Sequence, residues 1–165
     1  MFVHLRLHSE FSVVDGTNRI DDAVQVAARD GQPALAITDL NNLFGGIKFY
    51  KEARNKGVKP LIGAEIHLES LTQDAAQFTR LLLLVQSHAG YLRLCILLTR
   101  AFRTNQYRGR AEIRREWFTE TGTEGLIALS GAHPGDVGQA LIADNGEAAG
   151  ELARAWAALF PNRYY

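Results

Sequence analysis

Apolar and polar positions change their spacing repeatedly along the chain, and this pattern predicts strands and helices in alternation. Strands are expected at residues 3–7, 34–38, 59–68, 81–85 and 125–130. Helices are expected at residues 43–56, 90–102, 137–143 and 147–160, and from Ile20, with Asn18 as its cap, to Gly31. Residues 103–115 are polar and predict a loop. Strands that alternate with helices at this spacing favour βαβ units and a mostly parallel sheet, open or barrel-like.

Several apolar residues have a structural interpretation. Trp117 and Trp156 lie in helix-like stretches and are expected to pack in the core, and Cys95 is expected to be a small buried residue. Gly45 and Gly46 lack the lysine and serine or threonine of a phosphate-binding loop, so they are expected to permit close packing of a helix on the sheet. The expected apolar side of the helix at 43–56 consists of Phe44, Ile47, Phe49, Tyr50 and Ala53.

The end of the chain favours an incomplete domain. A βαβ pattern continues from the helix at 147–160 to another strand, and Arg163-Tyr164-Tyr165 has the character of its first residues. We therefore expect residues 1–165 to form one domain that is truncated before its last strands. The alternative is a domain that ends by docking its aromatic terminus.

Composition narrows the class of protein. A length of 165 residues with 47% hydrophobic residues allows one domain with a real core. Eighteen basic and 18 acidic residues give zero net charge, which argues against a free-standing nucleic-acid-binding protein but permits a locally basic face or a domain of a larger DNA-handling protein. One cysteine excludes an intramolecular disulfide and a thiolate metal cluster. The chain shows neither a signal-peptide start nor an apolar run that could span a membrane, so we predict a soluble cytoplasmic protein.

Candidate chemistry lies near the carboxyl ends of the predicted strands, where parallel α/β folds place their active residues. His8 ends the first predicted strand, Asp39 follows the second, and Glu65 and His67 belong to the third. Imidazole and carboxylate groups at successive strand ends are typical of a metal-dependent hydrolase, because such ligands must converge on one cation. The spacing alone is a weak signal, and His67 is equally compatible with an exposed strand residue.

Five segments, in order, resemble one known family. They are residues 2–16 (FVHLRLHSEFSVVDG), 36–45 (AITDLNNLFG), 59–65 (KPLIGAE), 90–95 (GYLRLC) and 125–131 (GLIALSG). Together they are similar to the PHP (polymerase and histidinol phosphatase) domain, in the branch found at the N-terminus of the bacterial DNA polymerase III alpha subunit. The resemblance covers nearly the whole chain. It implies a distorted (β/α)7 TIM-like barrel with mostly parallel strands, of which this chain holds the first part, while the polymerase domains are absent.

The resemblance also implies where a metal site is retained and where it is lost. Active members of the family bind up to three metal ions, usually zinc or manganese, and hydrolyse phosphoesters. Ligand-type residues remain at His8, Asp15, Asp39 and Glu65. Other ligand positions of the family hold Arg6, Leu40, Arg80 and Ala132. Arginine has no lone pair to offer a metal, so we hypothesise that Arg6 and Arg80 form structural ion pairs with Asp39 and Glu65 in place of the metal cluster.

These departures favour a domain without catalytic residues and without a bound cofactor. In this branch of the family, the PHP domain serves as a scaffold and as the docking platform for the proofreading exonuclease subunit. The expected partners are therefore that subunit and the rest of the polymerase chain, with DNA reached only through the full-length protein and no contact with membranes. The alternative is a residual phosphoesterase or pyrophosphatase that uses zinc or manganese with the vestigial residues His8, Asp39, Glu65 and His67.

Overall fold

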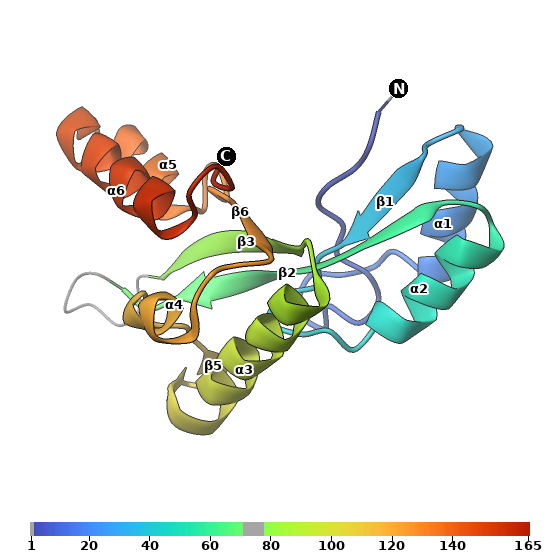
Figure 1. Cartoon of the computed structure of the whole chain (residues 1–165), viewed down its shortest axis with the longest axis horizontal. Coiled ribbons are helices and arrows are strands. Elements are labelled where there is room, and N and C mark those ends of the chain that lie inside the picture. The colour runs from blue at the N-terminus through green and yellow to red at the C-terminus, as the bar shows by residue number, and fades with distance from the viewer. Residues whose placement is uncertain (1, 71–77) are drawn as a thin grey trace. The chain divides into compact units, whose positions relative to one another are not determined.

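A computed structural model describes residues 2–70 and 78–165. The chain divides into two compact units, Met1–Glu65 and Ile66–Tyr165. Each unit contains helices and strands, which Figure 1 labels in chain order. The mixed α/β class predicted from the sequence is therefore confirmed.

The first unit is built on two parallel strands. Strand β1 (Ala34–Ile37) is buried along its whole length, and it pairs in parallel with β2 (Lys59–Leu68), with Ala34 opposite Lys59 and Ile37 opposite Ile62. Helices α1 (Ile20–Arg29) and α2 (Gly46–Asn55) lie side by side (Figure 1). The core that these elements share consists of Ile20, Val24, Ala27, Leu35, Ile37, Phe49, Ala53 and Val58.

The first predicted strand, residues 3–7, runs beside β1 without forming a regular ladder. His4 makes an isolated parallel bridge with Leu35, and the carbonyls of His4 and Leu7 accept hydrogen bonds from the backbone N–H groups of Ala36 and Thr38. The N–H of Leu7 donates instead to the Thr38 hydroxyl at 2.9 Å. The Thr38 side chain thus takes the place of a backbone acceptor in the ladder. Residues 3–7 therefore run parallel to β1, as predicted, but do not form a regular strand.

Helix α1 begins without the predicted cap. Its cap position is Arg19, which makes no capping hydrogen bond, and the Asn18 side chain donates to the carbonyl of His8 at 3.2 Å. The end of the helix is as predicted. Gly31 has a φ of +67°, and its N–H donates to the carbonyl of Ala28 at 3.1 Å, which is the usual way a glycine ends a helix.

Helix α2 is shorter than predicted and buries only part of its expected apolar side. A Cβ at Gly45 would lie 3.0–3.1 Å from atoms of Ile37, Ile20 and Phe11, so this glycine permits close packing as expected. Gly46 has no such neighbour among the described residues. Phe49 and Ala53, four residues apart, face the core; the prediction was wrong for Phe44, Ile47 and Tyr50, which are exposed because they lie outside that stripe.

The second unit pairs its main strands in the opposite sense. Strand β3 (Thr79–Val85) is antiparallel to β6 (Leu126–Leu129), with Leu82 opposite Leu129 and Val85 opposite Leu126. The prediction of parallel strands was therefore wrong for this pair. The prediction was based on the apolar residues on both faces of β3, and residues 81–84 are indeed buried. Such a pattern shows that a strand is covered on both faces, but it does not show the direction of the neighbouring strand.

Helices and a small hairpin complete the second unit. Helix α3 (His88–Thr104) is followed by strands β4 (Gln106–Tyr107) and β5 (Arg110–Ala111), which form a hairpin where a polar loop was predicted. Helix α4 (Glu116–Thr121) comes after that region. Helices α5 (Asp136–Ile142) and α6 (Gly146–Leu159) lie side by side (Figure 1), close to the predicted bounds.

Packing in the second unit centres on aromatic residues. Trp117 and Trp156 are buried, as predicted, and Phe118 packs edge-to-face on Trp156. The indole N–H of Trp156 donates to the buried carboxylate of Asp136 at 2.7 Å, which also accepts from Arg115 at 2.9 Å. Cys95 is only partly buried, contrary to prediction, because its neighbours Leu92 and Ile96 on α3 face solvent.

The last residues extend the sheet of the second unit. Residues 163–165 run parallel to β6: the N–H of Ala128 donates to Arg163, the N–H of Tyr165 donates to Ala128, and the N–H of Ser130 donates to Tyr165. These residues thus have the strand character that the sequence predicts.

Over residues 2–70 and 78–165, neither unit closes its strands into a barrel, and the complete barrel stays a prediction. No helix in this part of the chain has both the length and the apolarity needed to cross a bilayer.

Candidate functional site

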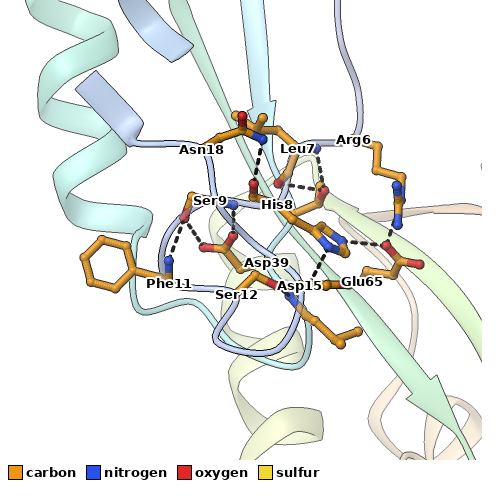
Figure 2. Close-up of polar contacts among 12 residues, drawn as sticks. Arg6, Leu7, His8, Ser9, Phe11, Ser12, Asp15, Asn18, Asp39 and Glu65 are labelled. Carbon is orange, nitrogen blue, oxygen red and sulfur yellow. Dashed lines mark hydrogen bonds and ion pairs between the residues drawn. The ribbon is translucent and has the colours of Figure 1, made fainter. Parts of the chain in front are cut away.

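A buried carboxylate, Glu65, is the centre of a polar cluster in the first unit. Glu65 lies on β2, and its side chain is 2% exposed. Its Oε2 atom accepts hydrogen bonds from Arg6 Nε at 2.8 Å and from His8 Nε2 at 2.7 Å. Figure 2 shows both side chains pointing at this oxygen. The ion pair between Arg6 and Glu65 is one that the sequence analysis hypothesised, and it places a permanent positive charge on the buried carboxylate.

His8 bridges two carboxylates. Its Nδ1 atom lies 2.9 Å from Asp15 Oδ1, and its Nε2 atom lies against Glu65. A carboxylate accepts hydrogen bonds, so the two contacts together favour the protonated, imidazolium form of His8. Asp15 Oδ1 also accepts a hydrogen bond from the Ser12 hydroxyl at 2.7 Å.

Asp39 is held by a single neighbouring residue. It follows β1 and is 1% exposed. Its Oδ1 atom accepts from the backbone N–H of Ser9 at 2.6 Å, and its Oδ2 atom accepts from the Ser9 hydroxyl at 2.8 Å. Both oxygens of this buried carboxylate are therefore engaged by protein donors (Figure 2).

The loop at residues 9–16 brings these groups together by closing on itself. The N–H of Ser12 donates to the carbonyl of Ser9 at 2.8 Å, and the N–H of Gly16 donates to the carbonyl of Ser12 at 2.7 Å. A Cβ at Gly16 would lie 1.8 Å from the Ser9 carbonyl oxygen, so the loop requires glycine there. The Ser12 hydroxyl also accepts from the N–H of Leu40 at 3.0 Å, which fixes the loop to the residues that follow β1.

Sequence reasoning missed both serines. They were part of a recognised motif but had no assigned role. The available signal was that two hydroxyl-bearing residues closely follow His8, in a loop beside carboxylates that burial would leave in need of donors.

Burial and charge displace the pKa values of three groups in the cluster. Burial lowers the pKa of His8, but the hydrogen bond to Glu65 and the charges of Glu65 and Asp15 outweigh it and raise that pKa above 6.5. Burial raises the pKa of Glu65, but hydrogen bonds from His8 and Arg6, together with their charges, lower it from 4.5 to about 2. The pKa of Asp39 is raised above 3.8 because burial outweighs the two hydrogen bonds from Ser9.

The donor set does not fit the metal cluster that the resemblance implies. A metal ligand must offer a lone pair, and both nitrogens of His8 already lie within hydrogen-bond distance of carboxylate oxygens, at 2.9 Å and 2.7 Å. Arg6 and His8 share the same oxygen of Glu65, and both oxygens of Asp39 accept from Ser9. Within residues 2–70 and 78–165, no three His, Cys, Asp or Glu side chains are grouped so that they could hold a metal ion.

Four other positions singled out from the sequence have different surroundings. Leu40, in the first unit, is buried and provides only its backbone, which bridges to Glu65 in parallel. His67, Arg80 and Ala132 belong to the second unit. There, the buried ring of His67 packs edge-to-face on Phe78, and Ala132 has a φ of +50°. The hypothesised pairing of Arg80 with Asp39 or Glu65 stays a prediction.

Three curated proteins to which this chain is similar in sequence share one name. Over 164 residues, the chain is 45% identical to DNA polymerase III subunit alpha of Pseudomonas fluorescens. It is also 45% identical to the Pseudomonas aeruginosa protein of that name and 39% identical to that of Escherichia coli K12, each over 165 residues. Each alignment covers 99% of this chain but only 14% of the relative. The chain thus spans about one seventh of the length of these curated relatives.

Two solved structures are similar to part of this chain. One is a putative metal-dependent phosphoesterase from Bifidobacterium adolescentis, with 18% identity and a TM-score of 0.43. The other is an amidohydrolase from Chromobacterium violaceum, with 22% identity and a TM-score of 0.48. Each likeness covers 60% of this chain and 32% of the other.

The family itself follows from the extent of the sequence match. Residues 4–165 match the family described as "PHP domain". That range includes the loop at residues 9–16, both strands of the first unit and all the helices of the second. The chain therefore belongs to the PHP domain family.

Proposed function

We propose that this chain is the PHP domain of a replicative DNA polymerase alpha subunit, that it has lost hydrolytic activity, and that it acts as a structural scaffold and as the docking platform for the proofreading exonuclease subunit. The polymerase assignment is supported by the relatives, which are DNA polymerase III alpha subunits. On this proposal the chain works in the cytoplasm, meets DNA only through the full-length polymerase, and belongs to a barrel whose remaining strands lie elsewhere in that protein.

The observation that carries the loss of activity is the ion pair between Arg6 and Glu65. The guanidinium nitrogen lies 2.8 Å from a carboxylate that is 2% exposed. Arginine stays protonated at every pH at which the protein is folded, so a metal ion at this carboxylate would have to displace a cation that is covalently part of the chain. The charge compensation that a metal would supply is instead supplied by Arg6 and by the imidazolium of His8.

Metal content and hydrolysis test this part of the proposal. The purified chain is dialysed against zinc or manganese, its bound metal is counted, and hydrolysis of a chromogenic phosphoester and of pyrophosphate is measured with added manganese. We expect no stoichiometric metal and no hydrolysis above the blank. The matched variant is Asp39→Asn, which keeps an acceptor for Ser9 while removing the charge. Hydrolysis by the wild type that is lost in this variant would establish the phosphoesterase alternative and refute the proposal.

The docking role has its own test. The purified exonuclease subunit of the same organism is titrated into the chain and binding is followed by calorimetry. We expect a saturable complex with one exonuclease subunit per chain. A folded chain that binds no exonuclease subunit at concentrations that support the polymerase complex would refute the docking role and leave the loss of hydrolytic activity to be judged separately.

A further inference from the structure

The strongest unassigned feature of the molecule is the outer face of α2. Ile47, Tyr50, Lys51 and Arg54 are spaced three or four residues apart, so they share one side of the helix. The opposite side carries Phe49 and Ala53, which are buried in the core of the first unit. The outer face therefore points away from that core.

This face is apolar at the start of the helix. Ile47 is 72% exposed and Tyr50 is 51% exposed, and Phe44, two residues before the helix, is 71% exposed. Three large, exposed apolar side chains within seven residues of sequence make this face a candidate for a protein contact. Nothing in the cluster around Glu65 requires them.

Lys51 and Arg54 make the same face basic toward the end of the helix, and further lysines lie close by in the sequence. All four lysines of the protein, Lys48, Lys51, Lys56 and Lys59, lie within 12 residues, and Arg54 lies among them. Glu52 is the only acidic residue between positions 46 and 59. Since the chain as a whole is neutral, this concentration of charge is local.

Two of these cations are available for a partner on this face. Lys48 is neutralised by Glu10 at 2.9 Å and Asp21 at 3.5 Å. Lys51 and Arg54 are exposed, and neither has an ion-pair partner within the described parts of the chain. Outside the core, α2 thus presents an apolar end and an unneutralised basic end.

We propose that the outer face of α2 is the surface that binds an acidic amphipathic segment of the exonuclease subunit. This inference deepens the proposed docking role and rests on it. Charge complementarity defines the occupant: acidic side chains pair with Lys51 and Arg54, and apolar anchors cover Phe44, Ile47 and Tyr50. Ile47 and Arg54 are about 10 Å apart along the helix axis, so the segment carries its anchors and its acids about two helical turns apart.

A protein segment fits this face better than a nucleic acid does. Single-stranded nucleic acid is held by cations together with aromatic rings on which the bases stack. Ile47, the most exposed of the three apolar residues on this face, offers no stacking surface and no charge. Aromatic residues and arginine, which this face carries beside Ile47, are enriched in protein–protein interfaces.

The test compares two variants with two matched controls. Ile47→Ser removes the central anchor, and the double variant Lys51→Glu with Arg54→Glu reverses the charge. Leu141→Ser on α5, where the leucine is 59% exposed, controls for loss of an exposed apolar residue. Arg154→Glu on α6 controls for charge reversal at an exposed arginine. Circular dichroism confirms that each variant is folded, and the Kd for the purified exonuclease subunit is measured at low and at high salt.

We expect Ile47→Ser to raise the Kd about thirtyfold, the change that accompanies loss of a central anchor residue. We expect the charge reversal to weaken binding and to abolish its dependence on salt. Both controls should bind like the wild type. Wild-type binding that survives both α2 changes would overturn this surface but not the docking role, whereas absence of wild-type binding would overturn both. Binding of a single-stranded oligonucleotide that requires Lys51 and Arg54 would overturn the protein partner.

Discussion

Glu65→Gln tests the electrostatic core of the cluster, because glutamine keeps the shape of the protonated acid and removes its charge. In the folded chain the pKa of Glu65 is about 2 instead of 4.5, because Arg6 and His8 donate to it. A pKa that folding lowers stabilises the fold above the ordinary pKa, and this stability is lost as the pH falls toward the folded value. The shift from 4.5 to about 2 corresponds to about 3 kcal/mol. Because Arg6 is 56% exposed and screened by solvent, this figure is an upper bound.

The assay compares the free energies of unfolding of wild type and Glu65→Gln at pH 5.5 and at pH 3. His8 is protonated in folded and unfolded chains at both values, since its pKa in the fold lies above 6.5. Linkage predicts a difference of about 3 kcal/mol at pH 5.5 and roughly 1.4 kcal/mol at pH 3. Both tryptophans belong to the second unit, so the reporter is amide hydrogen exchange in α1, which belongs to the unit that holds Glu65.

Glu151→Gln is the control, because Glu151 is exposed on α6. It should unfold like the wild type at both pH values. A difference between wild type and Glu65→Gln that is the same at pH 3 and pH 5.5, or that is absent, would show that the ionised carboxylate does not stabilise the fold.

Three further substitutions test the packing and the hydrogen bonds. Gly45→Ala should lower the free energy of unfolding, measured by urea titration, by about 1–3 kcal/mol, because its Cβ would lie 3.0–3.1 Å from three apolar side chains. Gly46→Ala is the control: its Cβ would have open space around it, so the same titration should show no change in the free energy of unfolding. Ser9→Ala should cost about 1–3 kcal/mol because Asp39 loses a donor while buried, seen as faster hydrogen exchange in α1. Asp136→Ala should lower the urea midpoint of tryptophan fluorescence by an amount equivalent to about 3–5 kcal/mol, because it removes a buried acceptor from two donors; an unchanged midpoint would contradict that role.

The sequence predicts elements whose pattern is local. Strand β2 was predicted at residues 59–68, directly after the expected helix at 43–56, and it is found there. The direction of β6 relative to β3 was not predictable in this way. Burial on both faces is compatible with either direction, and the pairing is decided by residues more than 40 positions apart.

The candidate site was predictable in its residue types and not in its connections. Arg6 stands at a position where the family has a metal ligand, and this arginine indicated an ion pair with a carboxylate. In the structure, Arg6 pairs with Glu65. That Ser9 would engage both oxygens of Asp39 could not be deduced, because it depends on how the loop at residues 9–16 closes around Gly16. The glycine permits this closure, but the sequence does not show which hydrogen-bond donors the closed loop brings to Asp39.

The confinement of every lysine to residues 48–59 has a practical consequence for biochemistry on this protein. Apart from the terminal amine, reagents that couple to primary amines attach only on or just after α2. A sensor chip, a fluorophore or a crosslinker introduced through amines would therefore cover the helix face on which the binding experiments depend, and would report weak binding for a reason unrelated to affinity. Attachment through the single thiol of Cys95, which is partly accessible on α3, modifies none of these lysines.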